Sequence, residues 1–420
     1  MDTLRYIVAN LSNKWSLTKK IIYLQVLKQQ ILIMKYRLHR ALLICILTFL
    51  TANVYAQKII IPERWQIKPV RPIFQEDTLT IRIFGDLMMH EAQIKDAARS
   101  NGTYEFSTYF THIQKYLDNS DLNIGNLEFT LGGKPYTGYP AFSAPDEYAR
   151  HITDCGFNVF LTANNHICDK YSAGMTRTLR IYRELAQSDS IVFTGTAGNQ
   201  EEFEKTTPLI IVRKGIRIAI INATYGTNIG SEKPWPKTNY LRDKKMLKDA
   251  LIKAKENADI VVVFPHWGDE YFLTHNSRQE SEAKWFAENG ADIIIGAHPH
   301  VVQDAGVIEV KDTTASDGIK KVPVVYSLGN AISNMSAENT QIELMATLKI
   351  TKNKDGEIKH LPLEFTYLWS SRPGGYCNHY TMLPVKDQIG KSNEWIGKWE
   401  YDKMMTTYNR VKQATKIKEQ

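Results

Sequence analysis

The stretch Ala291-Asp-Ile-Ile-Ile-Gly-Ala-His-Pro-His300 decides how the rest of the sequence is interpreted. Its run of β-branched apolar residues predicts a buried strand, and the glycine and proline that follow end the strand and turn the chain. His298 and His300 then lie one residue apart, so in extended geometry both imidazoles can face one point. Imidazole is the commonest neutral metal ligand, and the pair is therefore a candidate metal site. Two unrelated loop histidines are the alternative interpretation.

Six apolar runs in the chain each end in a polar residue of a type that binds metals. These residues are Asp86, Glu128, Asn165, His266, the pair His298 and His300, and Asn330. Helical patterns separate the runs, and strands that alternate with helices predict an α/β fold whose sheets carry helices on their faces. Ligands of such sheets collect beyond the carboxyl ends of the strands. We therefore expect these side chains to meet at one rim and to bind metal.

The mixture of imidazole, carboxylate and carboxamide groups limits the choice of metal. Zn, Mn, Fe or Ni suit such a set, whereas Ca and Mg prefer shells of oxygen alone. We expect one or two divalent transition metal ions, because Glu128 has two oxygens and could bridge a pair. His166 lies beside these groups and could protonate a leaving group, since its unperturbed pKa is near neutrality.

Neighbouring polar residues are assigned supporting roles. We expect His90, Trp267, Glu270 and Asn330 to orient the ligands or to contact substrate. Plain packing is the alternative for Trp267, and side-chain bonding to a loop is the alternative for Asn330. The three cysteines beyond the amino-terminal region are expected to be free: Cys155, Cys168 and Cys377.

The net charge of +7 comes from the amino-terminal residues. Residues 1–56 hold eight Lys or Arg against Asp2 alone, and the remaining 44 basic and 44 acidic residues cancel. The body of the protein therefore has no excess positive charge, and we expect no nucleic-acid partner.

The amino-terminal residues have the parts of a secretory signal. A cationic segment begins at Met34, an apolar core runs from Ala41 to Ala52, and Val54-Tyr-Ala56 resembles a cleavage site before Gln57. Twelve apolar residues are few for a membrane span, so a cleaved signal is favoured over an anchor. We expect translation to start at Met34; an uncleaved anchor is the alternative.

These patterns divide the chain into four parts. We expect a leader with a signal peptide over 1–56, an irregular lead-in over 57–78, an α/β domain with the candidate site over 79–370 and a carboxyl-terminal extension over 371–420. Strands are predicted at 79–85, 122–125, 157–161 and 260–264, helices at 106–119, 146–155, 242–257 and 278–289, a hairpin turned at 354–356, and a surface insertion at 227–240.

Six short motifs occur in an order that resembles that of a known family. They are Gly85-Asp86-Leu87-Met88, Asn126-Leu127-Glu128, Asn164-Asn165-His166 with Asp169, His266-Trp267-Gly268-Asp269-Glu270, Gly296-Ala297-His298-Pro299-His300 and Tyr326-Ser-Leu-Gly-Asn330. Over residues 79–335 the set resembles the bacterial capsule-synthesis (CapA) family, which is associated with poly-γ-glutamate. That family is similar to calcineurin-like metallophosphoesterases, so the resemblance implies a four-layer α-β-β-α sandwich with a dinuclear metal site.

The resemblance also implies roles for individual residues. Asp86 would bind the first metal, Glu128 would take the place of the bridging aspartate, Asn165 and His266 would bind the second metal, His298 and His300 would complete the pair, and His166 would be the acid beside the leaving group. The chain departs from the pattern at Met88, where metallophosphoesterases usually have a histidine. We expect that His90 could replace it from the following loop.

The function expected from these observations is that of an exported metal-dependent hydrolase, cleaving a phosphoester or an amide. It would act in the synthesis, release or attachment of an anionic capsule polymer such as poly-γ-glutamate, in the periplasm or at the cell surface. Its expected partners are that polymer and membrane-bound capsule synthesis or export proteins. The first alternative is a non-catalytic, polymer-binding component of a capsule export complex. The second, a cytosolic nucleotide phosphatase, requires that the leader is no signal.

Overall fold

The structure of the protein is a computed structural model. It describes residues 77–420 apart from 189–190, 231–232 and 314–317, together with 25–26, 28–30 and 32. The predicted signal sequence, its cleavage site and nearly all of the lead-in lie outside the described residues. Within the described part, no helix has the length and apolar character that crossing a bilayer requires.

The first sheet has the strand order β17-β16-β14-β1-β2-β3-β4. Its strands are β1 (Asp77–Leu87), β2 (Leu122–Leu127), β3 (Val159–Leu161), β4 (Val192–Thr194), β14 (Ile342–Lys352), β16 (Glu364–Ser371) and β17 (Thr381–Pro384), with β13 (Asn330–Ile332) paired to β1 and β15 (Ile358–His360) paired to β14. Strands β1 to β4 run parallel, whereas β14, β16 and β17 are antiparallel to their neighbours. Half of this sheet therefore sends its carboxyl ends to one rim.

The second sheet has the order β11-β12-β10-β9-β7-β6. Its strands are β6 (Leu209–Arg213), β7 (Ile216–Thr224), β9 (Ile260–His266), β10 (Ile293–Ile295), β11 (Ala305–Lys311) and β12 (Ile319–Val325). The four central strands are parallel, and the edge strands β6 and β11 are antiparallel to their neighbours. A short pair, β5 (Thr196–Ala197) and β8 (Lys237–Thr238), lies outside both sheets.

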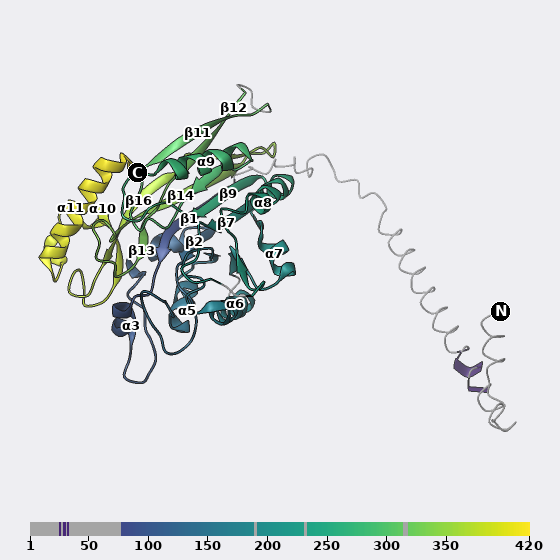
Figure 1. Cartoon of the computed structure of the whole chain (residues 1–420), viewed down its shortest axis with the longest axis horizontal. Helices are drawn as coiled ribbons and strands as arrows, with labels where there is room; N and C mark the ends of the chain where they lie inside the picture. The colour runs from purple at the N-terminus through teal and green to yellow at the C-terminus, as the bar shows by residue number, and fades with distance from the viewer. Residues whose placement is uncertain are drawn as a thin grey trace, which may run out of the picture. The chain divides into compact units, whose positions relative to one another are not determined.

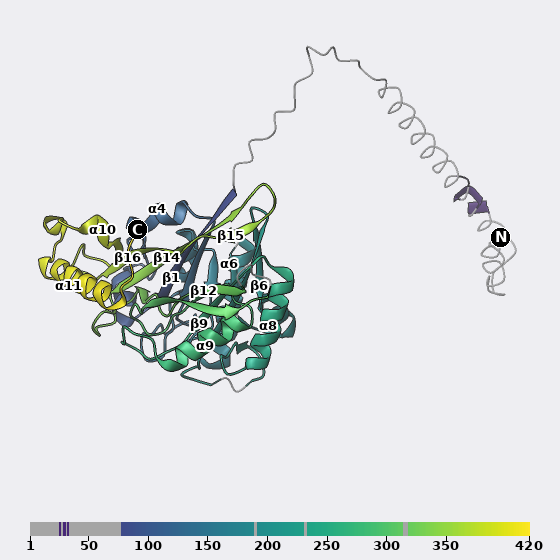
Figure 2. The same ribbon diagram turned by 90° about the horizontal axis from the view of Figure 1, so that it is seen from above.

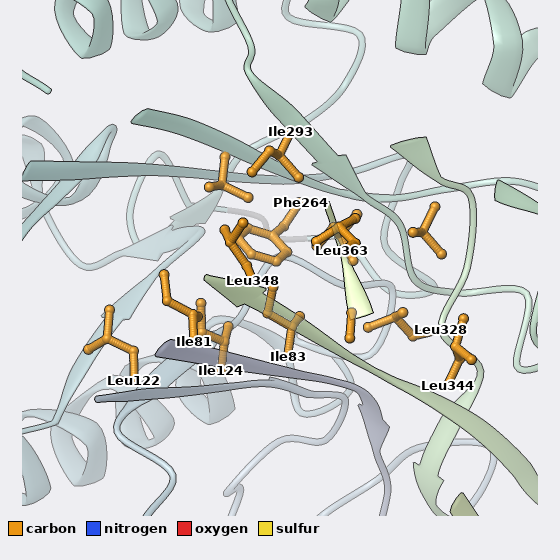
Figure 3. Close-up of a cluster of buried hydrophobic side chains, with 14 of the residues drawn as sticks. Ile81, Ile83, Leu122, Ile124, Phe264, Ile293, Leu328, Leu344, Leu348 and Leu363 are labelled. Carbon is orange, nitrogen blue, oxygen red and sulfur yellow. The ribbon is translucent and has the colours of Figure 1, made fainter. Parts of the chain in front are cut away.

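Alternating side chains bind the two sheets together. Ile81 and Ile83 of β1 belong to the same apolar cluster as Val262 and Phe264 of β9, while the intervening Val263 faces the opposite side of its sheet. Figure 3 shows the inner side chains meeting between the two sheets. Successive residues of a strand face opposite sides, so β9 and β10, which are covered on both faces, form continuous apolar runs, whereas β1 alternates apolar residues with Thr80 and Arg82.

Helices cover the two outer faces. On the first sheet lie α5 (Asp146–Asp154) and α6 (Tyr171–Ser188), and on the second lie α8 (Lys244–Asn257) and α9 (Ser277–Glu288). Figure 1 shows these pairs on opposite sides of the sheets. The expected four-layer α-β-β-α sandwich is confirmed.

The carboxyl-terminal residues complete the sandwich. Met404, Tyr408 and Val411 of α11 (Lys398–Thr415) belong to the inner apolar cluster, which also contains Tyr367 and Trp369 of β16. Figure 2 shows α11 beside β16. The remaining short helices are α3 (Glu91–Ala97), η2 (Thr111–Ile113), α4 (Gln114–Asp118), α7 (Gln200–Thr206), α10 (Val385–Gln388) and η3 (Ser392–Glu394).

Most predicted elements lie within a few residues of their expected bounds, and the hairpin between β14 and β15 turns where expected, with Gly356 at a φ of 85°. The helix predicted over 106–119 is wrong in its first part, since helical structure begins only at Thr111. Thr108 exchanges hydrogen bonds with Tyr380 and Thr381, which holds this segment to β17 instead. Strand β11 was not predicted. Cys155, Cys168 and Cys377 are free, as expected.

Candidate metal centre

The carboxyl ends of parallel strands from both sheets meet at one rim and carry the predicted ligands. The ladder between β1 and β2 shifts register between Ile83 and Asp86. Asp86 then pairs with Asn126 of β2 on one side and with Asn330 of β13 on the other. Such irregularities re-aim side chains beside functional sites, and this one places Asp86 at the centre of the rim.

Donor atoms of the predicted ligands are close enough to share an ion. They form three overlapping groups in which one ligand atom from each residue lies within 4.8 Å of the others: Glu128 with His266 and His298, Asp86 with Glu128 and His300, and Glu270 with His298 and His300. The sequence-predicted residues Asp86, Glu128, His266, His298 and His300 are thus brought together from four strands. Their role as ligands stays a prediction.

Glu128 carries the strongest sign that an ion belongs here. Its carboxyl group is fully buried, and neither oxygen has a hydrogen-bond partner among the described residues. The nearest imidazole nitrogens, Nε2 of His266 and of His300, are 3.5 Å and 3.8 Å from Oε1, too far for good hydrogen bonds. Burial and the charge of Asp86 raise the pKa of Glu128 well above its ordinary value. Buried polar atoms without partners are rare, and a bound cation would satisfy both oxygens.

Asn165 and His266 face each other at the group formed by Glu128, His266 and His298. His266 Nε2 lies 2.7 Å from Asn165 Oδ1, and His266 Nδ1 lies 3.3 Å from Nδ2 of Asn126. Asn126 Nδ2 also donates to Asp86 Oδ1 at 2.7 Å. The imidazole is therefore fixed through Nδ1, and Nε2 faces the oxygens of Asn165 and Glu128.

His300 is held between two oxygen acceptors. Its Nδ1 lies 2.9 Å from Asn330 Oδ1 and 3.3 Å from Asp86 Oδ2. Burial opposes the charged imidazole, but the hydrogen bond and charge of Asp86 outweigh it, so the pKa of His300 is raised. Burial likewise opposes ionised Asp86, yet His300 and His266 leave its pKa lowered. Asn330 orients a ligand in the way that carboxamides and carboxylates orient metal-bound histidines.

The other two imidazoles are neutral. Burial lowers the pKa of His266 to about 3 and that of His298 well below its ordinary value. Neutral imidazole is the form that binds metal. Nδ1 of His298 is buried and has no hydrogen-bond partner in the described part of the chain.

The backbone at the two neighbouring histidines is strained. His298 has a φ of 100° and His300 a φ of 58°, both in the left-handed region that non-glycine residues avoid. Each such residue costs about 1 kcal/mol or more, and such conformations cluster at functional sites. The strain turns both imidazoles toward Glu128.

His166 forms a second, adjacent pair with Asp169. Its Nδ1 donates to Asp169 Oδ2 at 2.6 Å, and the same oxygen accepts from the backbone N–H of Phe142 at 2.7 Å. His166 is 3% exposed and belongs to none of the three ligand groups. The carboxylate fixes the ring and leaves Nε2 as the nitrogen that can exchange a proton with a bound molecule.

The residues given supporting roles lie in different places. Nδ1 of His90 is 3.2 Å from both Gln93 Oε1 and the backbone nitrogen of Asn334, and His90 joins none of the ligand groups. The expectation that His90 could replace the missing histidine at Met88 therefore finds no support in its position.

Trp267 packs beneath the site. It is buried, and its Nε1 donates to the backbone oxygen of Tyr326 at 2.9 Å. Gly296 permits this contact, because a Cβ atom there would lie 2.1 Å from the same oxygen. Trp267 thus supports the strand end that carries the histidines.

Several residues of the site were missed from the sequence. They are Asn126, Asn164, Tyr225, Asn228 and Glu343. Asn126 and Asn164 stand inside quoted motifs, and buried Glu343 interrupts an apolar strand, so each had a signal. Asn228 had none: it lies in the expected surface insertion, yet its Nδ2 is 3.4 Å from both ring nitrogens of His166. The ring of Tyr225 lies 4.5 Å from that of His298, between centroids.

Two solved structures align with much of the chain. The NAD nucleotidase NadN of Haemophilus influenzae is 14% identical, with a TM-score of 0.42, and the alignment covers 81% of this chain and 68% of that one. The 5'-nucleotidase of Candida albicans is 10% identical, with a TM-score of 0.39, and covers 81% of this chain and 59% of that one. At these scores neither structure says anything about function here.

Two sequence relatives each align with about two thirds of the chain. The capsule biosynthesis protein CapA of Bacillus anthracis is 30% identical over 302 residues, 69% of this chain and 68% of the relative. The PGA biosynthesis protein CapA of Bacillus subtilis (strain 168) is 28% identical over 306 residues, 69% of this chain and 73% of the relative. Residues 80–335 also match the model of the family described as bacterial capsule synthesis protein PGA_cap. The six motifs lie inside this match. The chain belongs to that family.

Proposed function

We propose that the protein is an exported metal-dependent hydrolase that acts at the cell envelope on an anionic capsule polymer such as poly-γ-glutamate. It would serve in synthesis, release or attachment of the polymer, beside membrane-bound capsule synthesis or export proteins. The observation that carries the proposal is Glu128, whose two buried oxygens lack hydrogen-bond partners among the described residues while the neutral imidazoles of His266 and His298 lie close to them. The relatives named for capsule and PGA biosynthesis support the choice of polymer.

The donor set fits one or two divalent transition metal ions, such as Zn, Mn, Fe or Ni. Asp86, Glu128 and His300 would hold one ion, and Glu128, Asn165, His266 and His298 would hold the other. Ions bound there would supply Lewis-acid activation of water and of the scissile group.

The chain's own residues supply positioning and proton transfer. Asn126 and Asn330 fix the groups they contact, Asp86 and the imidazole of His300, so that the donor atoms keep one arrangement. The His166–Asp169 pair would deliver a proton from Nε2 to the leaving group and would be oriented for this by Asp169. The same geometry serves an amide or a phosphoester, because charge develops on oxygen in both transition states.

The test combines metal analysis with turnover. Purified protein is dialysed, its metal content measured, and cleavage of poly-γ-glutamate and of a chromogenic phosphodiester followed. His298→Ala should lose metal and turnover, while His360→Ala, a change of a histidine outside all three ligand groups, should lose neither. A metal-free protein without turnover that still binds the polymer would refute the hydrolase and identify a polymer-binding component.

A further inference from the structure

Glu270 lies beside the metal centre on its solvent side. It is exposed, in contrast to the buried His298 and His300, yet one of its oxygens and one ring nitrogen of each histidine all lie within 4.8 Å of one another. Glu270 is thus near donors of both proposed metal positions.

Backbone bonds fix Glu270 against the two histidines. The N–H of Trp267 donates to Ala297 O at 3.0 Å, and the N–H of Tyr271 donates to Pro299 O at 2.9 Å. These bonds flank Glu270 in the chain and tie its loop to the segment that carries His298 and His300. Tyr271 adopts a φ of 72°, an unfavourable conformation for tyrosine. An exposed side chain on a free loop would not need such restraint.

The two proposed positions differ in their number of candidate donors among the described residues. The position at His266 has four groups, since Asn165 Oδ1 is 2.7 Å from His266 Nε2. The position at His300 has three, Asp86, Glu128 and His300. Structural zinc sites use four protein ligands and catalytic zinc sites use three with water or substrate in the fourth place, so the position at His300 has room for a further ligand. The nearby apolar side chain of Met88 offers nothing, because it packs in the cluster beneath the helices.

We propose that Glu270 is a metal ligand that acts together with His298 and His300 at the solvent side of the metal centre. This inference rests on the proposed function, because it requires that metal binds. His298 supports it independently: its buried Nδ1 has no partner among the described residues, and its ring lies within the Glu270 group. A carboxylate on the exposed side is also the ligand that an incoming substrate could displace.

The test is metal affinity, measured on the full chain with Zn²⁺ as the probe. Each variant is dialysed against Zn²⁺, its stoichiometry determined by elemental analysis, and its affinities determined by competition with a chromophoric chelator. The variants are Glu270→Ala and Glu270→Gln. The matched control is Asp269→Asn, whose exposed carboxylate bonds Asn276 and belongs to no ligand group.

We expect wild type and Asp269→Asn to bind two ions, and Glu270→Ala to keep one while its second affinity falls by about tenfold or more. Glu270→Gln, which retains one oxygen but no charge, should fall between them. Wild-type stoichiometry and affinities in both Glu270 variants would overturn the inference while leaving the proposed function intact. A wild-type chain that binds no Zn²⁺ would overturn both.

Discussion

Replacing Glu343 by glutamine tests how one buried carboxyl group, close to Asp86, affects the stability of the fold. Glu343 is 1% exposed; its Oε1 accepts from the backbone N–H of Gly85 at 2.5 Å, and its Oε2 has no partner among the described residues. Burial raises its pKa from 4.5 to about 8. Between these two pH values the unfolded chain releases this proton while the folded protein keeps it. The group therefore costs stability progressively as pH rises through this window.

The size of the effect follows from the two pKa values. Their separation corresponds to about 5 kcal/mol, at about 1.4 kcal/mol for each pH unit. In metal-free protein we expect the free energy of unfolding of Glu343→Gln, relative to wild type, to increase by about 3 to 5 kcal/mol between pH 4.5 and pH 8. Contributions of groups that do not interact with Glu343 cancel in this difference, and glutamine keeps an oxygen that can accept the N–H of Gly85.

The assay is urea unfolding followed by tryptophan fluorescence at several pH values in the presence of a chelator. The matched control is Glu364→Gln, which removes a carboxyl paired with Lys349 near the surface. It should leave the pH dependence of wild type unchanged. Parallel stability curves for Glu343→Gln and wild type over this pH range would refute the reasoning.

Three further outcomes are expected. Burial and Asp86 raise the pKa of Glu128, so metal binding must release its proton. The affinity for Zn²⁺ should therefore fall by about tenfold for each pH unit below neutrality and for each proton released. Calorimetry in buffers of different ionisation enthalpy counts these protons. Gly85→Ala would place a Cβ atom 1.9 Å from a backbone oxygen and should lower the free energy of unfolding by about 3 kcal/mol. The control Gly306→Ala, where the nearest atom to the added Cβ is 3.9 Å away, should change it little. Denaturant midpoints of the two variants test this prediction. Asp169→Asn should lower kcat by about 100-fold at unchanged metal content, since it releases the ring of His166; equal loss of kcat and metal would contradict that role.

Element types were predictable where the chain carries long periodic patterns. The strands around Val262 and Ile294 are continuous apolar runs because both faces of each are buried, and the strand around Ile81 alternates apolar residues with Thr80 and Arg82; both patterns can be recognised in the sequence alone. The start of the helix at Thr111 was not predictable, because a distant strand, β17, holds the preceding residues. Local helix propensity depends on nearby residues and carries no information about a hydrogen-bond partner about 270 residues away.

The candidate site was predictable in composition and only partly in arrangement. Motif order singled out Asp86, Glu128 and His300, and the fold brings them together. The sequence did not show which of these side chains are placed to bind metal and which only orient their neighbours. His90 is adjacent in sequence to the strand end but turns toward Asn334, whereas Glu270 reaches the histidines because its loop is bonded to theirs.

The sequence alone determined that apolar strands alternate with helices and end in groups that bind metal, because such preferences depend on each residue and its near neighbours. Only the tertiary structure decided the left-handed backbone at His298 and His300, the lack of a hydrogen-bond partner for Glu128 in the described part of the chain, and the contact of Asn228 with His166. These features depend on packing between segments far apart in the chain. The sequence of one segment does not specify which atoms of a distant segment will pack against it.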